Sequence, residues 1–353
     1  MYAARFLSIA VLTLLVAVLA GCGSTTDSTP PAEAQPAAIG NTEPDSDTVT
    51  LKSVDLVLNW FPEAEHGGYY AALVHGYYEE AGLAVEIVAG GPGVKASRQV
   101  ATGARMFGCD NADKVLMAAS QEALTVALLA PMQNSPRCIM VHKDSGIRKF
   151  EDLKDMTIAL GTTSSFALYM QKRLPLTNVR VVPYKGALAR FLNEKDFAQQ
   201  AYVFSEPFLA QKQGAEPFNL MASGFGFNPY TSVLVTNPDT LRDDPETVFK
   251  FVQASKKGWQ KYLEDPVETN KYINQQNTEM GMDILAFGAK ELKELCITDD
   301  VPAEQLGAMK TERWEVLAKQ LVEVEAIKAD SVDIKTLVDT QFLTTETTAP
   351  AAE

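Results

Sequence analysis

The sequence contains 353 residues, of which 46% are hydrophobic, and carries a formal net charge of −14 at pH 7. This acidic balance argues against nucleic acid and against an anionic lipid surface as partners. The globular part, residues 51–343, is long for a single hydrophobic core and is typical of two lobes.

The first fifty residues indicate export. The apolar run from Phe6 to Ala20 is shorter than the about 20 residues that span a bilayer, and has the length of a signal-peptide core. It ends in Leu19-Ala20-Gly21-Cys22, which resembles the bacterial lipobox and implies a lipid on Cys22. The alternative is an ordinary secretory signal with an incidental Cys. We therefore expect a signal peptide at 1–21, a lipidated Cys with a flexible tether at 22–50, and a disordered tail at 344–353.

Strand and helix patterns alternate along the next part of the chain. The β-branched, alternating segments predict strands at 54–60, 85–88, 106–109 and 124–130. The apolar spacing predicts helices at 69–81, 94–102 and 112–121. This rhythm favours a parallel sheet wrapped by helices.

The same rhythm resumes after Pro136. Strands are predicted at 138–142, 157–160, 179–183, 200–204 and 232–236, with a helix at 166–173. The rest is predicted to be helical, at 248–263, 267–276, 284–295 and 303–323. We expect an α/β fold with lobe I at 51–136 plus 232–343 and lobe II at 137–231. A ligand cleft would lie between them, since ligands of open sheets bind beyond the carboxyl ends of the strands.

The residues that could carry redox or metal chemistry are scattered. Cys109, Cys138 and Cys296 match no zinc spacing and are expected to be three isolated buried thiols, although a disulfide between two of them stays open. No catalytic triad and no paired metal ligands emerge around the three His residues. We therefore expect neither an enzyme nor a bound metal or cofactor.

The segment LNWFPEAEHGGYYAALVHGYYEEAGLAVEI, residues 58–87, resembles the opening of substrate-binding proteins related to the thiamine-pyrimidine-precursor binders, whose superfamily includes aliphatic-sulfonate binders. The resemblance continues through FGCDNADKVLMA, YVFSEPFLAQKQG and GFNPYTSVLVT. It implies a type II periplasmic-binding-protein fold and ABC import. An enzyme branch that builds the thiamine pyrimidine shares this fold, but its Cys-rich metal motif is missing here.

The resemblance and the leader together predict a lipid-anchored, monomeric protein on the extracytoplasmic face of a membrane. Its partners would be a small heteroaromatic ligand, with a thiamine pyrimidine precursor as one candidate, and an ABC permease with its ATPase. Two alternatives stay open: a thiamine-pyrimidine-synthase-like enzyme, and a ligand-sensing lipoprotein without transport.

Ten residues are predicted to line the ligand cleft, because they are polar or aromatic groups near strand ends or crossings. Trp60 would stack on a flat ring, and Glu206, at the end of a lobe II strand, would accept hydrogen bonds from an amino group. Their structural alternatives are a core Trp and a surface or hinge ion pair. The full set is Asn59, Trp60, His66, Tyr69, Asn111, Ser164, Ser165, Tyr184, Glu206 and Tyr230.

Overall fold

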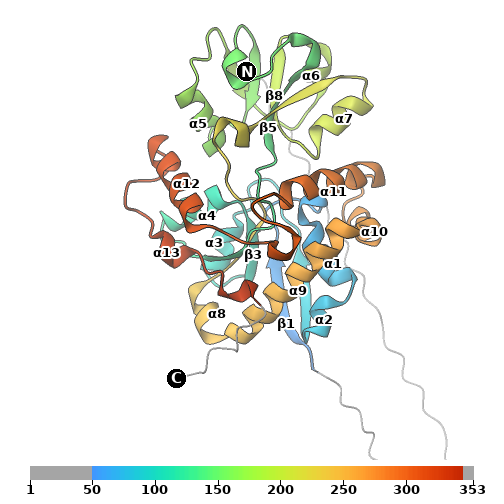
Figure 1. Ribbon diagram of the computed structural model, residues 1–353, viewed down its shortest axis with the longest axis vertical. Helices are drawn as coiled ribbons and strands as arrows, with labels where there is room; N and C mark the ends of the chain where they lie inside the picture. Colours follow the sequence, from blue (N-terminus) through green and yellow to red (C-terminus); the bar gives the residue numbers. More distant parts are fainter. Residues whose placement is uncertain (1–49, 345–353) are drawn as a thin grey trace, which may run out of the picture. The chain divides into compact units, whose positions relative to one another are not determined.

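The computed structural model describes residues 50–344 (Figure 1). The first of two sheets there contains β1 (Lys52–Val57), β2 (Leu83–Val88), β3 (Phe107–Asp110), β4 (Val126–Leu129) and β10 (Val233–Thr236). Their order is β2-β1-β3-β10-β4. The first three strands are parallel, but β10 runs antiparallel to both its neighbours. The four strands from the first part of the chain therefore run in one direction, as expected, and only the returning strand β10 is antiparallel, because the chain re-enters this sheet at the carboxyl end of β3, where Val233 pairs with Asp110.

The second sheet contains β5 (Arg137–His142), β6 (Thr157–Leu160), β7 (Arg180–Pro183), β8 (Phe197–Tyr202) and β9 (Pro217–Met221). Their order is β7-β6-β8-β5-β9. β6 is parallel to β7 and β8, whereas β5 is antiparallel to β8 and β9. The sequence places the β8 strand too late, at 200–204. Glu206 consequently does not end a strand, and it begins helix α7 (Glu206–Lys212) instead.

Several helices differ from the sequence prediction in length. The expected helix 69–81 is two helices, α1 (Gly67–Val74) and α2 (Tyr77–Glu80), because Gly76 adopts a left-handed φ of 73° between them. The expected helix 303–323 shrinks to α12 (Thr311–Glu323), after a short 3-10 turn at Ala303–Gln305 and a left-handed Gly307. The other helices outside residues 137–231 are α3 (Ala96–Ala101), α4 (Ala112–Ala119), α8 (Pro238–Asp243), α9 (Pro245–Glu264), α10 (Val267–Gln276), α11 (Met282–Cys296) and α13 (Ile334–Leu337). Those beside the second sheet are α5 (Ser165–Arg173) and α6 (Ala189–Asn193).

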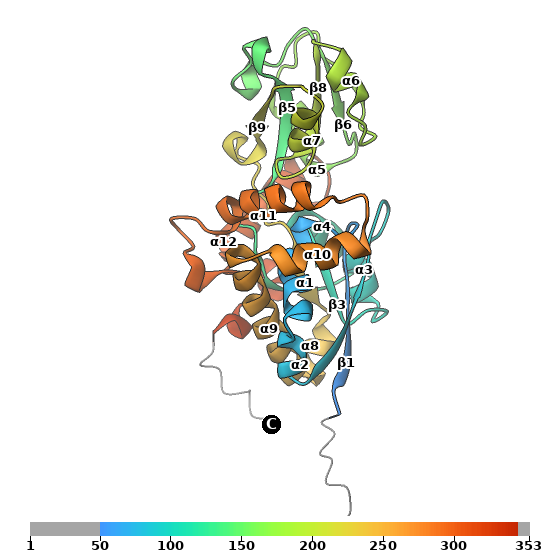
Figure 2. The ribbon, with the colours of Figure 1, turned by 90° about the vertical axis from the view of Figure 1, so that its right-hand side faces the viewer.

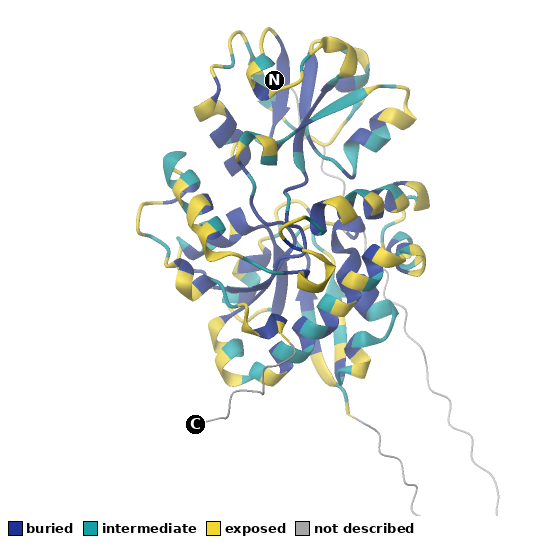
Figure 3. Ribbon diagram, in the orientation of Figure 1, coloured by how far each residue is buried: buried dark blue, intermediate teal, exposed yellow. Residues whose placement is uncertain are grey.

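The hydrophobic core beside the first sheet includes a close contact between α1 and α9, which lie side by side in Figure 2. A methyl group on Gly68 would lie 2.0 Å from the Trp259 ring, and one on Gly67 would lie 2.0 Å from the Tyr262 ring. Glycine is thus required on this face of α1 because two large aromatic side chains occupy the space. Strands β3, β6 and β10, and the edge strand β4, are buried along their whole length (Figure 3).

Cys109, Cys138 and Cys296 are buried and free, which confirms the expectation of isolated thiols. Within residues 50–344 no helix combines the length and apolar character that crossing a membrane requires. The predicted signal peptide, Cys22, nearly all of the tether, and the tail beyond residue 344 lie outside the described residues.

Candidate functional site

A short acidic segment follows β1 and is buried. Glu63, Glu65 and His66 are 6%, 1% and 0% exposed, and the 3-10 turn η1 (Ala64–His66) holds the last two. The loop before it is fixed at Pro62, whose carbonyl oxygen accepts a hydrogen bond from the Asn277 side chain at 2.9 Å. Burial of carboxylates at this density is costly unless they acquire partners.

These buried side chains have few partners of their own. His66 Nε2 lies 2.9 Å from Asn59 Oδ1 and 3.3 Å from Glu65 Oε1. Neither His66 Nδ1 nor Glu65 Oε1 makes a hydrogen bond to any described residue. The Glu63 carboxylate likewise has no hydrogen-bond or ion-pair partner within residues 50–344. The segment therefore presents acceptor atoms that the chain itself leaves unused.

Glu206 supplies a further, half-buried carboxylate from the second sheet's side. Its Oε1 accepts a hydrogen bond from the Tyr184 hydroxyl group, and its Oε2 accepts one from the Tyr202 backbone N–H at 2.9 Å. Burial raises the pKa of Glu206, although the hydrogen bonds from Tyr184 and Tyr202 act in the opposite direction. Burial and the nearby Glu206 charge also raise the pKa of Tyr184, so its hydroxyl group remains a donor.

Helix α11 brings the two acidic segments together. It packs against both η1 and α7, and a methyl group on Gly288 would lie 2.7 Å from Ala64 Cβ and 3.5 Å from the Phe204 carbonyl oxygen. The pKa of Glu63 is raised well above its usual range, first by burial and then by the charges of Glu65 and Glu206. We call Glu63, Glu65 and Glu206 the acidic triplet.

A second set of contacts joins the two sheets beside the acidic triplet. The Asp113 carboxylate accepts a hydrogen bond from the Ser165 hydroxyl group and lies 3.8 Å from Arg137 Nη2. Asn111, at the N-terminus of α4, donates from Nδ2 to the Tyr202 hydroxyl group at 3.1 Å. The Arg137 guanidinium lies over the Tyr202 ring, 5.5 Å from its centroid. Arg137 is therefore already engaged with Asp113 and Tyr202.

Six of the ten predicted residues thus lie in these two sets of contacts. Asn59 and His66 adjoin Glu65, Tyr184 and Glu206 bind one another, Asn111 contacts Tyr202, and Ser165 contacts Asp113. Their contact with a ligand remains a prediction.

The other four predicted residues make their contacts outside these two sets. Trp60 is 41% exposed and meets Phe61 edge-on with centroids 5.5 Å apart, so its core alternative is wrong. Tyr69 is a core residue whose hydroxyl group donates to the Ser232 carbonyl oxygen at 2.8 Å. Ser164 caps α5 by accepting from the Ala167 N–H. Tyr230 is buried beneath the Arg313 guanidinium.

The sequence interpretation missed Glu63, Glu65, Arg137 and Tyr202. A signal for the first two was available, since FPEAEHGG places two carboxylates and a His within four residues after a strand, where a core-facing segment should be apolar. Arg137 follows Pro136 at the first crossing between the sheets, a position that faces both of them. No such signal marks Tyr202.

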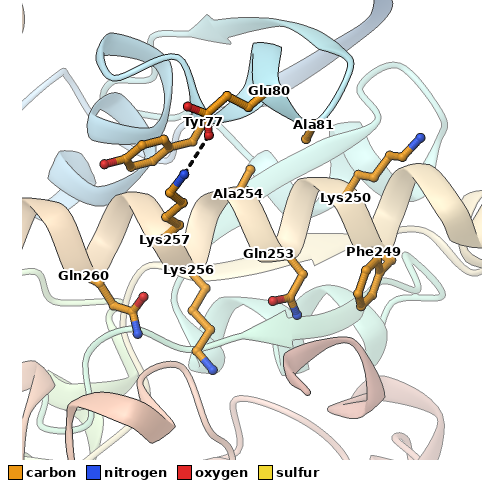
Figure 4. A pocket seen from close by; sticks show the side chains of 10 residues that line it. All are labelled: Tyr77, Glu80, Ala81, Phe249, Lys250, Gln253, Ala254, Lys256, Lys257 and Gln260. Atoms are coloured by element: carbon orange, nitrogen blue, oxygen red, sulfur yellow. Dashed lines mark hydrogen bonds and ion pairs between the residues drawn. The ribbon is translucent and has the colours of Figure 1, made fainter. Parts of the chain in front are cut away.

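Two hollows are lined by other residues than the acidic triplet, although the second of them includes the predicted site residue Tyr230. One, of about 470 Å³, lies between α2 and α9 and is lined by Tyr77, Phe249 and several Lys and Gln side chains (Figure 4). Its Lys257 is paired with Glu80 at 2.6 Å. The other, of about 450 Å³, lies beside the crossings and includes Asn228 and Arg313. Among residues 50–344 no group of His, Cys, Asp and Glu side chains has the geometry of a metal site.

A family model described as NMT1/THI5 like matches residues 63–269, which include the whole acidic triplet. The chain belongs to this NMT1/THI5-like family. It is 24% identical over 281 residues to the riboflavin-binding protein RibY of Chloroflexus aurantiacus, covering 75% of this chain and 76% of that protein. It is 21% identical over 282 residues to the formylaminopyrimidine-binding protein of Halalkalibacterium halodurans, covering 76% and 84%.

Solved structures confirm the two-lobed α/β fold of this NMT1/THI5-like chain. The putative periplasmic sulfonate-binding protein SsuA of a sulfonate ABC transporter from Methylobacillus flagellatus superimposes with a TM-score of 0.62 at 13% identity, covering 83% of this chain and 93% of that one. The desulfurization enzyme DSZB shares the fold with a TM-score of 0.55 at 14% identity, covering 83% and 97%. The fold therefore serves both binding and catalysis, whereas the two named relatives are binding proteins.

Proposed function

We propose that the chain is the substrate-binding component of an ABC importer and closes on a small, nitrogen-rich heteroaromatic ligand between its two sheets. The observation that carries this proposal is the acidic triplet, in which carboxylates from both sides of the fold converge with unused acceptor atoms. Ring amino groups are suitable donors, because each would satisfy an acceptor that is otherwise buried without a partner.

The charge of the site separates the ligand classes named for the relatives and structural neighbours. A sulfonate would bring a permanent negative charge beside two buried carboxyl groups and the half-buried Glu206, while Arg137 is held by Asp113. Like charges that are close together in a low-dielectric site repel each other strongly. Riboflavin and formylaminopyrimidine, for which the two relatives are named, are nitrogen heteroaromatics with N–H donors. A thiamine pyrimidine precursor belongs to the same class, and we place this chain with that class.

The predicted leader supplies the rest of the proposal. Lipidation of Cys22 would hold the protein on the outer face of a membrane, where it delivers its ligand to a permease. A Cys22→Ala variant should appear in the soluble extracellular or periplasmic fraction, or remain uncleaved, whereas the parent stays with the membranes. A processed and still membrane-bound variant would contradict the lipid anchor. Loss of uptake on deletion of the neighbouring permease gene would distinguish transport from sensing.

The test of the ligand class is native mass spectrometry of freshly purified protein, followed by identification of any small molecule released on denaturation. We expect a monomer that carries a nitrogen heteroaromatic, recovered chemically unchanged. Small-angle scattering should show a smaller radius of gyration with this ligand than without it, because two lobes joined by two crossings close as a hinge. Recovery of a sulfonate, or turnover of a pyridoxal-type or histidine-type substrate, would overturn the proposal.

A further inference from the structure

The acidic triplet has no basic counterion among residues 50–344. Glu63 is buried and Glu206 is half-buried, and each faces a further carboxyl group or a tyrosine hydroxyl group. The guanidinium of Arg137 binds Asp113 and covers Tyr202. No Lys or Arg within residues 50–344 forms an ion pair with a member of the triplet, whose only ion-pair partner there is His66.

A second observation concerns hydrogen bonding and not charge, and it involves two buried atoms, one in Glu65 and one in the adjacent His66. Glu65 Oε1 and His66 Nδ1 each lack a hydrogen-bond partner among the described residues. Helix α11 packs against both η1, which contains Glu65, and α7, which begins at Glu206. A buried carboxylate oxygen without a hydrogen bond is a place where a donor group is expected.

We infer that the ligand carries a positive charge, an ammonium or amidinium-type group, that pairs with Glu63 and Glu206 when the lobes are closed. This inference rests on the proposed function and narrows its ligand class from nitrogen heteroaromatics in general to cationic ones. Because the cation contacts carboxylates from both sheets at once, its positive charge also stabilises the closed arrangement of the lobes. A neutral ring of the same shape leaves the carboxyl groups of the triplet without a counter-charge, so it stabilises the closed state less than a cationic ligand does.

A matched pair of probes tests the inference. The first is a methylpyrimidine with a ring amino group and an aminomethyl arm, which is an ammonium at neutral pH. The second is the same ring with a hydroxymethyl arm, which is neutral. We expect isothermal titration at pH 7 to give the ammonium probe at least a tenfold lower Kd, about 1.4 kcal/mol.

Variants then assign the preference to the triplet. Glu63→Gln should reduce the preference for the ammonium probe to threefold or less, while Glu304→Gln, at an exposed carboxylate, should leave it unchanged. Thermal melts without probe establish that each variant is folded. Glu206→Gln serves as a second variant if Glu63→Gln does not fold.

The outcomes are distinguishable. Equal or tighter binding of the hydroxymethyl probe by the parent protein overturns the cation inference and leaves the proposed heteroaromatic ligand class intact. A preference for the ammonium probe that survives both Glu63→Gln and Glu206→Gln also overturns the inference, because other residues must then bind the ammonium group. Binding of neither probe overturns the inference, whereas the identification of the retained small molecule by mass spectrometry decides the proposed heteroaromatic class separately.

Discussion

The Asp113 carboxylate, in the first turn of α4, accepts a hydrogen bond from the Ser165 hydroxyl group, in the first turn of α5. Helix α4 belongs to the first sheet's side and α5 to the second, so this single contact joins the lobes. Burial acts to raise the pKa of Asp113, but the charges of Arg137 and Lys114 and the Ser165 hydrogen bond hold it below its ordinary value. The ionised carboxylate is therefore the form that the contact stabilises.

Replacement of Asp113 by Asn should consequently destabilise the protein by about 3 kcal/mol at pH 7, because it leaves the Arg137 guanidinium without its counterion. Ser165→Ala removes only a hydrogen bond and should cost about 1.5 kcal/mol. Urea unfolding measures both. A lowered pKa gives stability that is present above the ordinary pKa of 3.8 and lost below it, so the advantage of the parent should shrink as the pH falls through 3.8. An equal cost for the two variants would contradict the ion pair.

Glu63 should show the opposite dependence on pH. Its pKa is raised by burial and by the charges of Glu65 and Glu206, so the neutral carboxyl group is favoured in the folded state. The stability that this group contributes is full below its ordinary pKa of 4.5 and is lost as the pH rises toward the folded value. We expect Glu63→Gln to stabilise the ligand-free protein by at least about 1 kcal/mol at pH 7 and to have little effect at pH 4.

Thermal melts of Glu63→Gln and of Glu304→Gln between these two pH values would check this prediction. The Glu304 side chain is exposed, so its replacement should leave Tm unchanged at either pH. A Tm difference between parent and Glu63→Gln that does not vary with pH would show that the Glu63 carboxylate does not titrate differently in the folded state.

Gly68 tests the packing of α1 against α9. Alanine there would place Cβ 2.0 Å from the Trp259 ring, so the helices must separate or the indole must move. We expect Gly68→Ala to cost about 3 kcal/mol, at the upper end of overpacking. Gly224→Ala is the control, since a methyl group there meets nothing within 4 Å, and it should stay within about 0.5 kcal/mol. Guanidinium unfolding distinguishes them, and similar costs would mean that the helix pair adjusts freely.

The local patterns of the sequence were sufficient for many elements. The strand Thr157–Leu160 and the helix Val267–Gln276 have the predicted bounds, because each has a clear period and a clear stop. The antiparallel direction of β10 could not be predicted, since it depends on where the chain re-enters the first sheet and not on the residues of the strand. A strand's direction in a sheet is a property of connections, which periodicity does not report.

The convergence of the acidic triplet could not be predicted for a similar reason, although FPEAEHGG marks its first two members. Glu63 and Glu65 have neighbours in the sequence that are typical of a loop, and they are buried by α11, more than two hundred residues later. The contact of Gly288 with Ala64 and with Phe204 is what encloses them. Glu206 was predicted as a strand end and is in fact the first residue of α7.

Arg313 of α12 connects the two crossings between the sheets. Its Nη2 donates to the Gln133 carbonyl oxygen and, at 2.7 Å, to the Asn228 carbonyl oxygen. Arg313→Ala leaves both carbonyl groups without this donor, which should cost about 2 kcal/mol and widen the range of lobe positions. Arg313→Lys keeps the charge but lacks the planar fork that reaches both oxygens, so it should restore less than half of the stability.

The measurements for Arg313 are urea unfolding and the radius of gyration of the ligand-free protein. We expect both variants to show a larger radius than the parent, with Arg313→Ala the larger. A stability loss with an unchanged radius would mean that Arg313 supports α12 packing alone and does not restrain the hinge.

The last prediction concerns Trp60 and Glu206, which the sequence placed on opposite walls of the cleft. Trp60 is 41% exposed on the loop after β1, so its indole is available to replace the water lost from one face of a ligand ring. Glu206 offers a carboxylate that Tyr184 and the Tyr202 N–H already hold in place, so little ordering remains when a donor arrives. We expect Trp60→Ala and Glu206→Gln each to weaken binding of the recovered ligand about tenfold or more, on the order of 1.4 kcal/mol.

The stability of the two variants separates a ligand contact from a structural role. Trp60→Ala should shift the ligand-free unfolding free energy by no more than about 0.5 kcal/mol, because an exposed side chain contributes little to the core. Leu124→Ala, at a side chain that is 46% exposed, is its control and should change neither stability nor affinity. Glu206→Gln should leave the ligand-free protein as stable as the parent or more so, since burial disfavours the charge that it removes. Parent-like affinity in either variant would remove that residue from the site, and a collapse of the ligand-free melting temperature would show that it holds the fold together instead.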